Sequence, residues 1–246
     1  MRARTAPRRP LSRRLEDNRA AVARELGFGV SFDVIIKIKD LTVAGKDAFL
    51  LAIDGFVNTL VMTEVIHFLQ RTRREEIAPL TAERLDARRI GYIETDTADD
   101  LDQVIERVLS GFIALFGDGQ EECVLIEARV YPGRQPEEPE LEKMLRGPRD
   151  GFAETLLFNT ALVRRRLRDP KLRAEVIPVG RRSRTDVALL YIEDVTDPHL
   201  VADIRERVRQ IRVDVPWCAT ASGPTSWPAT SWRGTWCSSW TPPRWP

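Results

Sequence analysis

The chain has 246 residues, of which 43% are hydrophobic, and its formal net charge is +1. This length is enough for one large domain or two small ones with a buried core. The near-neutral charge excludes a general attraction for nucleic acid or acidic ligands. Cys123 is the only cysteine before residue 215, which excludes a disulfide framework there and fits a reducing compartment.

The N-terminus and the hydropathy profile carry no targeting or membrane signal. No run of 18 apolar residues occurs, so no transmembrane helix is predicted. Residues 1–14 are rich in arginine but have no apolar stretch, so they are not a secretory signal. We interpret residues 1–14 as a basic flexible arm, and we expect the chain as given to be cytoplasmic.

Residues 15–131 are predicted to form a first α/β subdomain. Apolar residues recur there with helical or alternating spacing, and glycine-containing turns separate the segments. Gly27 and Gly29 end the first helix. The turn G-D-G-Q joins two apolar strands as a hairpin. The predicted helices are 15–26, 56–70, 81–89 and 99–109, and the predicted strands are 32–41, 48–53, 92–94, 112–116 and 123–130.

Residues 132–150 are predicted to be a linker. The stretch Y-P-G-R-Q-P-E-E-P-E-L-E is rich in prolines and acids, which favours an exposed connection. We interpret residues 151–214 as a second, incomplete α/β subdomain. It contains a predicted helix that ends before Asp169, two strands separated by the basic turn G-R-R-S-R-T, and a helix with Pro198 in its first turn.

The two subdomains share an internal repeat. D-A-F-L-L-A-I-D at residues 47–54 resembles D-V-A-L-L-Y-I-E at residues 186–193, and both are preceded by helix, strand and turn. Any α/β unit resembles another over eight residues, but the matching flanks favour a shared architecture. The expected fold class is therefore α/β, with two similarly built small subdomains, each a mixed β-sheet flanked by α-helices.

Residues 215–246 differ in composition from the rest of the chain. They hold all six tryptophans and two of the three cysteines, and they contain no aspartate or glutamate. Six prolines and the lack of helical or strand periodicity predict a disordered tail. A tryptophan-rich tail that binds carbohydrate or membrane and a low-complexity disordered tail are two interpretations.

The third interpretation, which we favour, is a probable out-of-frame tail. If each codon began at the third base of the present one, the first bases of the Trp, Cys and Ser codons would become middle bases. Codons with T in the middle all encode apolar residues, so W-C-S-S-W would become an apolar run. With GC-rich codon choices the shifted tail can read L-L-E-G-H-V-V-L-V-V-D. That reading resembles V-L-S-G-F-I-A-L-F-G-D at residues 108–118.

No catalytic, cofactor-binding or metal-binding set of residues is evident, so no cofactor is expected and the chain is predicted not to be an enzyme. His67 and His199 are isolated on predicted helices, and Cys123 lies in an apolar strand. V-A-G-K-D lacks the first glycine of a phosphate-binding loop. G-D-G-Q-E-E lacks the ligand spacing of a calcium loop.

A set of arginines is the main surface signal. It follows a predicted helix and fills a predicted turn, and it could be either a solvated face with acidic neighbours or a contact for anionic lipid or a partner subunit. The basic set comprises Arg164, Arg165, Arg166, Arg168, Lys171, Arg173, Arg181, Arg182 and Arg184. The candidate contact residues within it are Arg164, Arg165, Arg166, Arg181, Arg182 and Arg184.

Two long segments resemble a known family. G-P-R-D-G-F-A-E-T-L-L-F-N-T-A-L-V-R-R-R-L-R-D-P-K-L-R and V-G-R-R-S-R-T-D-V-A-L-L-Y-I-E-D-V are similar to the spore germination protein family of nutrient-receptor A subunits. G-F-G-V-S-F-D-V-I-I and P-E-E-P-E-L-E in the first half support the same resemblance. It covers about residues 15–214, and the shifted tail also resembles the family's sequence.

The resemblance implies a soluble two-part domain that precedes transmembrane helices in the inner spore membrane. It implies a non-enzymatic role in the release of ions and dipicolinate during germination. Other germination and stage V sporulation membrane subunits, anionic lipid and further copies of the full-length protein are the implied partners. The alternative function is a module that binds a small germinant in a cleft between its two lobes.

Overall fold

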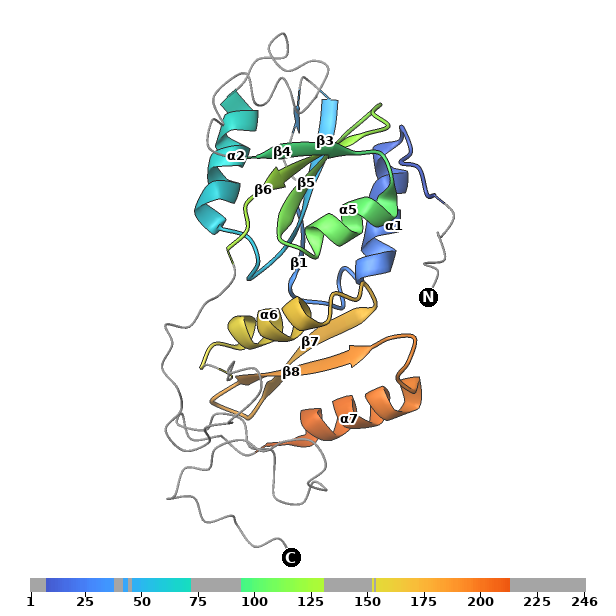
Figure 1. The fold of residues 1–246 in the computed structure, drawn as a ribbon. Helices are drawn as coiled ribbons and strands as arrows, with labels where there is room; N and C mark the ends of the chain where they lie inside the picture. Colours follow the sequence, from blue (N-terminus) through green and yellow to red (C-terminus); the bar gives the residue numbers. More distant parts are fainter. Residues whose placement is uncertain are drawn as a thin grey trace, which may run out of the picture. The chain divides into compact units, whose positions relative to one another are not determined.

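The computed structural model describes residues 8–37, 42–43, 46–71, 94–130, 152 and 154–212, and it shows a mixed α/β fold (Figure 1). Helices and strands occur where most of the periodic segments predict them. In chain order the elements are α1 (Leu15–Leu26), β1 (Val34–Lys37), β2 (Thr42–Val43), β3 (Lys46–Ile53), α2 (Thr59–Arg71), β4 (Thr95–Ala98), α5 (Leu101–Val108), β5 (Phe112–Gly117), β6 (Cys123–Glu127), α6 (Leu156–Arg166), β7 (Leu172–Val179), β8 (Thr185–Ile192) and α7 (Pro198–Gln210).

The chain divides into two compact units. The first contains the described residues up to Glu175 together with Leu190–Thr196, and the second contains Val176–Leu189 and the chain from Asp197 onward. Helix α6 and the start of β7 therefore belong to the first unit. Residues 1–7 of the predicted arm, and the whole of the predicted linker and tail, lie outside the described residues, so the predicted domain bounds remain a prediction.

The first unit is built on an antiparallel sheet. Its strand order is β1-β3-β5-β6-β4, and β2 pairs with β3 beside this path. Each of these pairings is antiparallel, so the prediction of a mixed sheet is wrong for this unit. A chain connection explains part of the difference, because β5 and β6 are joined by a short turn, which cannot support parallel pairing.

Two predicted elements around residues 81–98 have different outcomes. The predicted helix at 81–89 lies outside the described residues. The predicted strand at 92–94 is displaced, because β4 begins only at Thr95 and runs directly into the N-terminus of α5. The Asp100 side chain caps that helix by accepting hydrogen bonds from the backbone N–H groups of Asp102 and Gln103.

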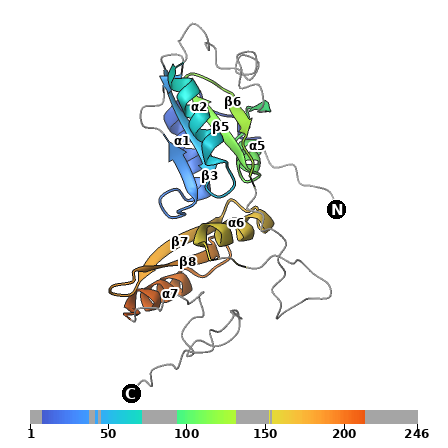
Figure 2. The same cartoon turned by 90° about the vertical axis from the view of Figure 1, so that its left-hand side faces the viewer.

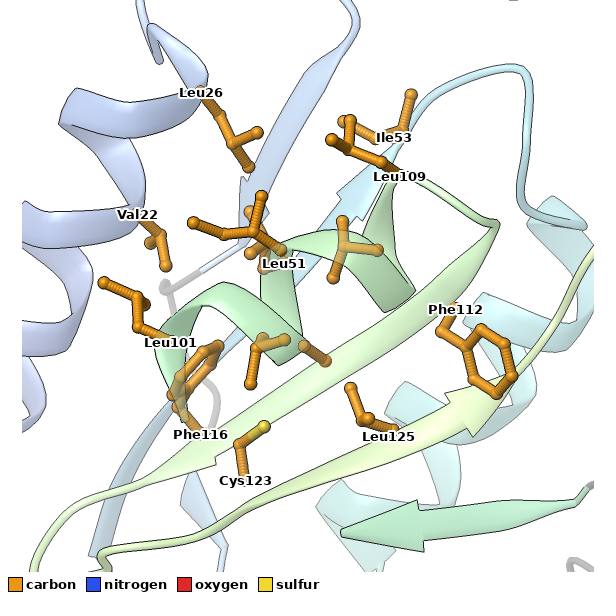
Figure 3. Close-up of a cluster of buried hydrophobic side chains, with 14 of the residues drawn as sticks. Val22, Leu26, Leu51, Ile53, Leu101, Leu109, Phe112, Phe116, Cys123 and Leu125 are labelled. Carbon is orange, nitrogen blue, oxygen red and sulfur yellow. The ribbon is translucent and has the colours of Figure 1, made fainter. Parts of the chain in front are cut away.

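Helices cover both faces of the first sheet (Figures 1 and 2). Side chains alternate along β3, so Phe49, Leu51 and Ile53 face one side while Ala48 and Leu50 face the other. On the first face they pack with apolar residues of α1 and α5, as Figure 3 shows for Val22, Leu26 and Leu101. On the other face they pack against Val65, Ile66 and Leu69 of α2. Two-sided coverage buries every residue of β3 from Ala48 to Ile53.

A smaller sheet is formed by β7 and β8, which pair as a hairpin. Ile177 and Val179 of β7 pack with Val208 of α7, and Val187 and Leu189 of β8 are partly buried against them. Asp197 caps α7 by accepting from the His199 N–H at 2.8 Å, and Pro198 occupies the first turn as predicted. This unit therefore has a much smaller apolar cluster than the first.

Candidate functional site

Most of the arginines predicted as contact residues lie on the surface. Arg165 and Arg166 are exposed in the last turn of α6, in the first unit. Arg181, Arg182 and Arg184 are exposed in the turn between β7 and β8, in the second unit. Arg184 has a φ of 44°, an uncommon left-handed conformation for a residue other than glycine. Each unit thus presents its own group of exposed arginines.

Arg164 does not belong to this surface, contrary to the prediction. Its side chain is 0% exposed and forms a bidentate ion pair with Asp33, whose side chain is 1% exposed. The Arg164 Nε donates to Asp33 Oδ2 at 2.5 Å, and Nη2 donates to Asp33 Oδ1 at 3.0 Å. Nη2 also donates to the Leu172 carbonyl at 3.3 Å. Arg164 is therefore an internal structural residue that joins α6 to the start of β1.

The helical repeat explains why Arg164 points inward while its two neighbours do not. Residues four apart share a face of a helix. Thr160 and Arg164 are therefore on one face, and both are buried, together with Ala161. Arg165 and Arg166 are turned away from it and are exposed. The apolar face of this helix was the signal that could have identified Arg164, but its partner Asp33 is 131 residues away in the sequence.

A second buried arginine, Arg173 at the start of β7, also belongs to the set predicted to form a basic surface, and that prediction is wrong for it too. Its side chain is 1% exposed and forms an ion pair with Glu193. It also donates to the carbonyl oxygens of Arg24 and Glu25, at the C-terminal end of α1. Those carbonyl groups have no partner within the helix, and a cation there also interacts favourably with the helix dipole. Arg173 therefore stabilises the end of α1 from a distant part of the sequence.

The glycine after α1 makes room for this arginine. Gly27 has a φ of 65° and ends the helix in the left-handed conformation. A Cβ atom added to Gly27 would lie 2.5 Å from the Arg173 Nε. A few residues later, Phe32 N–H donates to the Ala174 carbonyl at 2.9 Å. The motif G-F-G-V-S-F-D thus meets the segment L-R-D-P-K-L-R, so two stretches that carry the family resemblance form one buried junction.

Glu25 is held by cations at the border of this junction. Its carboxylate accepts from Arg9 at 2.9 Å and pairs with Lys171 at 3.1 Å. Burial raises the pKa of Glu25, but the hydrogen bonds from Arg9 and Lys171 lower it, and the net shift is below its usual value. Glu25 therefore stays ionised and links α1 to the N-terminal segment and to β7.

Cys123, His67 and His199, the residues considered in the sequence for catalysis, do not come together in the described part of the chain. Burial raises the pKa of the Cys123 thiol to about 12, so it is not a nucleophile at neutral pH. His67 on α2 and His199 on α7 are exposed and lie in different units. Within the described ranges no cluster of His, Cys, Asp and Glu could hold a metal ion. Nor is any helix in the described part long and apolar enough to cross a membrane.

The fold matches a solved germinant-receptor domain. The chain superposes on the N-terminal domain of the A subunit of the Bacillus megaterium spore germinant receptor GerK3 with a TM-score of 0.66 and 21% identity. The match covers 84% of this chain and 75% of that one. At this identity the similarity establishes the fold: the mixed α/β architecture is that of a spore germinant receptor domain.

Residues 23–218 match the model of the Bacillus/Clostridium GerA spore germination protein family, and the chain belongs to this family. It is 36% identical to stage V sporulation protein AF of Bacillus subtilis (strain 168) over 189 residues, covering 77% of this chain and 38% of that protein. It is 31% identical to spore germination protein GerLA of Bacillus cereus over 206 residues, covering 82% of this chain and 41% of that protein. The predicted resemblance is confirmed.

Family membership decides two of the broader predictions. The family consists of membrane germination proteins, and its members are receptors rather than enzymes, in agreement with the expectation that this chain has no enzymatic activity. The chain spans about two fifths of the length of these curated relatives, 38% and 41%.

Proposed function

We propose that the chain is the soluble N-terminal part of a membrane protein that takes part in the release of ions and dipicolinate during spore germination. The observation that carries this proposal is the 36% identity to stage V sporulation protein AF over 189 residues. The family match over residues 23–218 supports it, since it includes both compact units. In the full-length protein this part lies on the core side of the inner spore membrane.

The exposed arginines supply a basis for contact with the membrane or with partner subunits. Arg181, Arg182 and Arg184 are clustered in one exposed turn. A basic residue near an anionic membrane surface contributes about 1 kcal/mol of binding energy. The expected partners are anionic lipid, other germination or stage V sporulation membrane subunits, and further copies of the full-length protein. Nucleic acid is not expected, because the net charge is only +1.

Release of dipicolinate from spores tests the functional proposal. We expect spores that lack the full-length gene to release dipicolinate more slowly after germination is triggered, as followed by terbium fluorescence. An in-frame full-length copy should restore the rate. A copy that ends at residue 214 should not, because it lacks the membrane part of its relatives. Normal release without the gene would contradict the proposal. Saturable binding of a nutrient to the purified chain would favour the germinant-binding alternative.

Vesicle binding tests the arginine turn separately. We expect the full chain to bind vesicles that contain phosphatidylglycerol, and salt should weaken this binding. Arg181→Glu with Arg182→Glu should reduce it about 10-fold or more, since each reversal removes about 1 kcal/mol and adds repulsion. The matched control is Arg14→Glu with Arg24→Glu, which reverses two exposed arginines of α1 and its N-cap. If both double variants weaken vesicle binding equally, the turn between β7 and β8 is not a specific contact with the membrane.

A further inference from the structure

Residues 8–13 form a strap that is bound to the start of α5. The Leu11 N–H donates to the Asp99 carbonyl at 3.0 Å, and the Leu101 N–H donates to the Arg9 carbonyl at 2.9 Å. The Leu11 side chain is buried in the apolar cluster on the α1 and α5 face of the first sheet. The strap therefore binds to the first unit as a short peptide would, through backbone hydrogen bonds and an apolar anchor.

Arg9 is the main polar contact of the strap. Its Nε donates to Asp102 Oδ2 at 3.1 Å, and its Nη1 donates to Glu25 Oε1 at 2.9 Å. Its backbone N–H donates to Asp100 Oδ2 at 2.8 Å. The hydrogen bonds with Asp102 and with Glu25 raise the pKa of Arg9, so it keeps its charge. Arg9 thus links the strap to both α5 and α1.

Two further ion pairs hold the ends of the strap at the solvent surface. Arg8 pairs with Asp99, and the Arg13 Nε donates to Glu121 Oε1 at 2.8 Å. These four side chains are 47% to 73% exposed. Exposed ion pairs contribute little to stability, and salt weakens them. The strap therefore combines one buried anchor, Leu11, with contacts that are mostly exposed.

The strap is placed to open while the first unit stays folded. The family match begins at residue 23, so the strap precedes the part of the chain that the family model matches. The strands β3, β5 and β6 pair with one another and not with the strap. Segments with few buried apolar contacts and with exposed hydrogen bonds open at low free energy. Opening withdraws Leu11 from the cluster that also contains Leu15 and Leu101.

We propose that residues 8–13 are a reversible strap, and that the surface beneath it is a docking site for a basic segment of the pattern Arg-Arg-x-Leu. The chain's own residues 8–11 fill this site when the strap is closed. The device does not depend on the proposed role in germination.

The chemistry of the site selects this pattern. An acidic segment would meet repulsion from Asp99 and Asp102, and a segment without a leucine would leave the Leu11 position of the apolar cluster unfilled. Proline fits between the arginines and the leucine, because the backbone groups that bind are those of Arg9 and Leu11 and no N–H of Pro10 is needed.

Hydrogen exchange on the unaltered 246-residue chain tests whether the strap opens. The amides of Leu11, Leu101 and Gly119 donate across the junction between the strap and the first unit. They should exchange at least about 100-fold faster than the amide of Leu115 in β5, because local opening releases them. Salt should speed their exchange and leave that of Leu115 unchanged. Exchange of all four amides at one rate would show that the strap opens only on global unfolding, and would overturn the proposal.

A labelled peptide tests the docking site. The probe is fluorescein-labelled A-P-R-R-P-L-S-R-R, the sequence of residues 6–14. We expect saturable binding by fluorescence anisotropy to the full chain with Arg8→Ala and Arg9→Ala, in which the strap is loosened. Binding to the unaltered chain should be at least about 10-fold weaker, because its own strap competes at a high effective concentration.

A control peptide of the same charge separates docking from general attraction between charges. In A-P-R-R-P-S-S-R-R serine replaces the leucine anchor, and binding to the loosened chain should be at least about 10-fold weaker, because the apolar contact is lost. Equal binding of the two peptides, or no saturable binding of the first, would contradict the proposed site.

Two matched pairs of neutralised acids locate the site on the loosened chain. Asp99→Asn with Asp102→Asn should weaken binding of the first peptide about 10-fold or more, because these acids pair with its arginines. Asp100 is left unaltered, since it caps α5. Asp203→Asn with Glu206→Gln makes the same change in charge on exposed positions of α7 and should leave binding unchanged. Equal losses for the two pairs would show that only overall charge matters, and would overturn the assignment of the site.

Discussion

Strands β3 and β8 have nearly the same apolar pattern but different environments. In β3 the six residues from Ala48 to Ile53 are all buried, between helices α1 and α5 on one face and α2 on the other. In β8 the six residues from Val187 to Ile192 are partly exposed, and α7 supplies the apolar cluster beneath Val187 and Leu189. The pattern predicts a strand in both places, but the neighbouring elements decide how much that strand contributes to stability.

The two units also differ in their buried polar side chains. The first unit holds a buried ion pair between Asp33, just before β1, and Arg164 on α6. It also holds Arg173 at the C-terminal end of α1. The small cluster around Val208 in the second unit is apolar. We therefore expect substitutions to have large effects in the first unit and small ones in the second.

The largest expected effect comes from breaking the buried ion pair. Asp33→Ala or Arg164→Ala leaves one buried charge without its partner, which costs about 3–5 kcal/mol. Denaturant unfolding should show this loss for each single variant. Asp33→Ala with Arg164→Ala should cost clearly less than the sum, because neither charge then remains. Additive losses, or a loss for Arg164→Ala similar to that for Arg165→Ala, would show that the pair is not coupled.

Equivalent leucines of the repeat compare the two strands directly. Leu51→Ala should destabilise the protein by about 2–5 kcal/mol, because the cavity lies in a fully packed core. Leu190→Ala at the matching position of β8 should cost less than about half of this, since less apolar surface is lost from a partly exposed site. Both variants remove the same atoms from the same type of strand. Equal losses in denaturant unfolding would contradict the difference in packing between β3 and β8.

Substituting two nearby glycines, Gly27 and Gly29, distinguishes the cost of backbone strain from the cost of a collision with Arg173. Both Gly27 and Gly29 have positive φ angles, 65° and 88°. Gly29→Ala meets nothing within 4 Å and should cost about 1–2 kcal/mol from backbone strain alone. Gly27→Ala also collides with Arg173 and should cost about 1–3 kcal/mol more. Combining Gly27→Ala with Arg173→Ala should remove the steric part. Similar losses for the two single variants would show that the arginine does not pack there as described.

The smallest expected effect is the contribution of Glu25 to stability at acidic pH. Its pKa is lower in the folded chain than in the unfolded chain. The unfolded state therefore binds the proton more tightly, and the stabilisation present at neutral pH is lost as the pH falls below about 5. Glu25→Gln should flatten the decline of stability between about pH 5 and pH 3, measured by urea unfolding. An unchanged pH profile would mean that Arg9 and Lys171 do not stabilise the carboxylate.

Local sequence signals predicted much of the secondary structure and the family. Pro198 in the first turn of α7 and the hairpin of β5 and β6 follow from short-range chemistry and were predicted. The antiparallel order of the first sheet was not predicted. An apolar segment predicts a strand, but it does not identify the strands that pair with it or their direction. β4 was displaced because T-D-T-A is only weakly apolar and leads straight into a helix.

The contact residues were harder to predict than the helices that carry them. Three consecutive arginines resemble an exposed basic cluster, and this is correct for Arg165 and Arg166. Arg164 is buried because Asp33 compensates its charge, and the two residues are 131 positions apart. Arg173 likewise bonds to the carbonyl groups of Arg24 and Glu25 far away in sequence. Sequence periodicity shows on which face of its helix or strand a residue lies. It does not show which distant residue that side chain contacts.

Amide hydrogen exchange tests most directly whether β3 is enclosed by neighbouring elements and β8 is open on one edge. Phe49 and Leu51 lie opposite Phe116 and Ala114 of β5, and their amides should be strongly protected. Ala188 and Leu190, at the matching type of position, should exchange at least about 100-fold faster, while Val187 and Leu189 should show intermediate protection from β7. Equal protection of Ala188, Leu190, Phe49 and Leu51 would contradict the account.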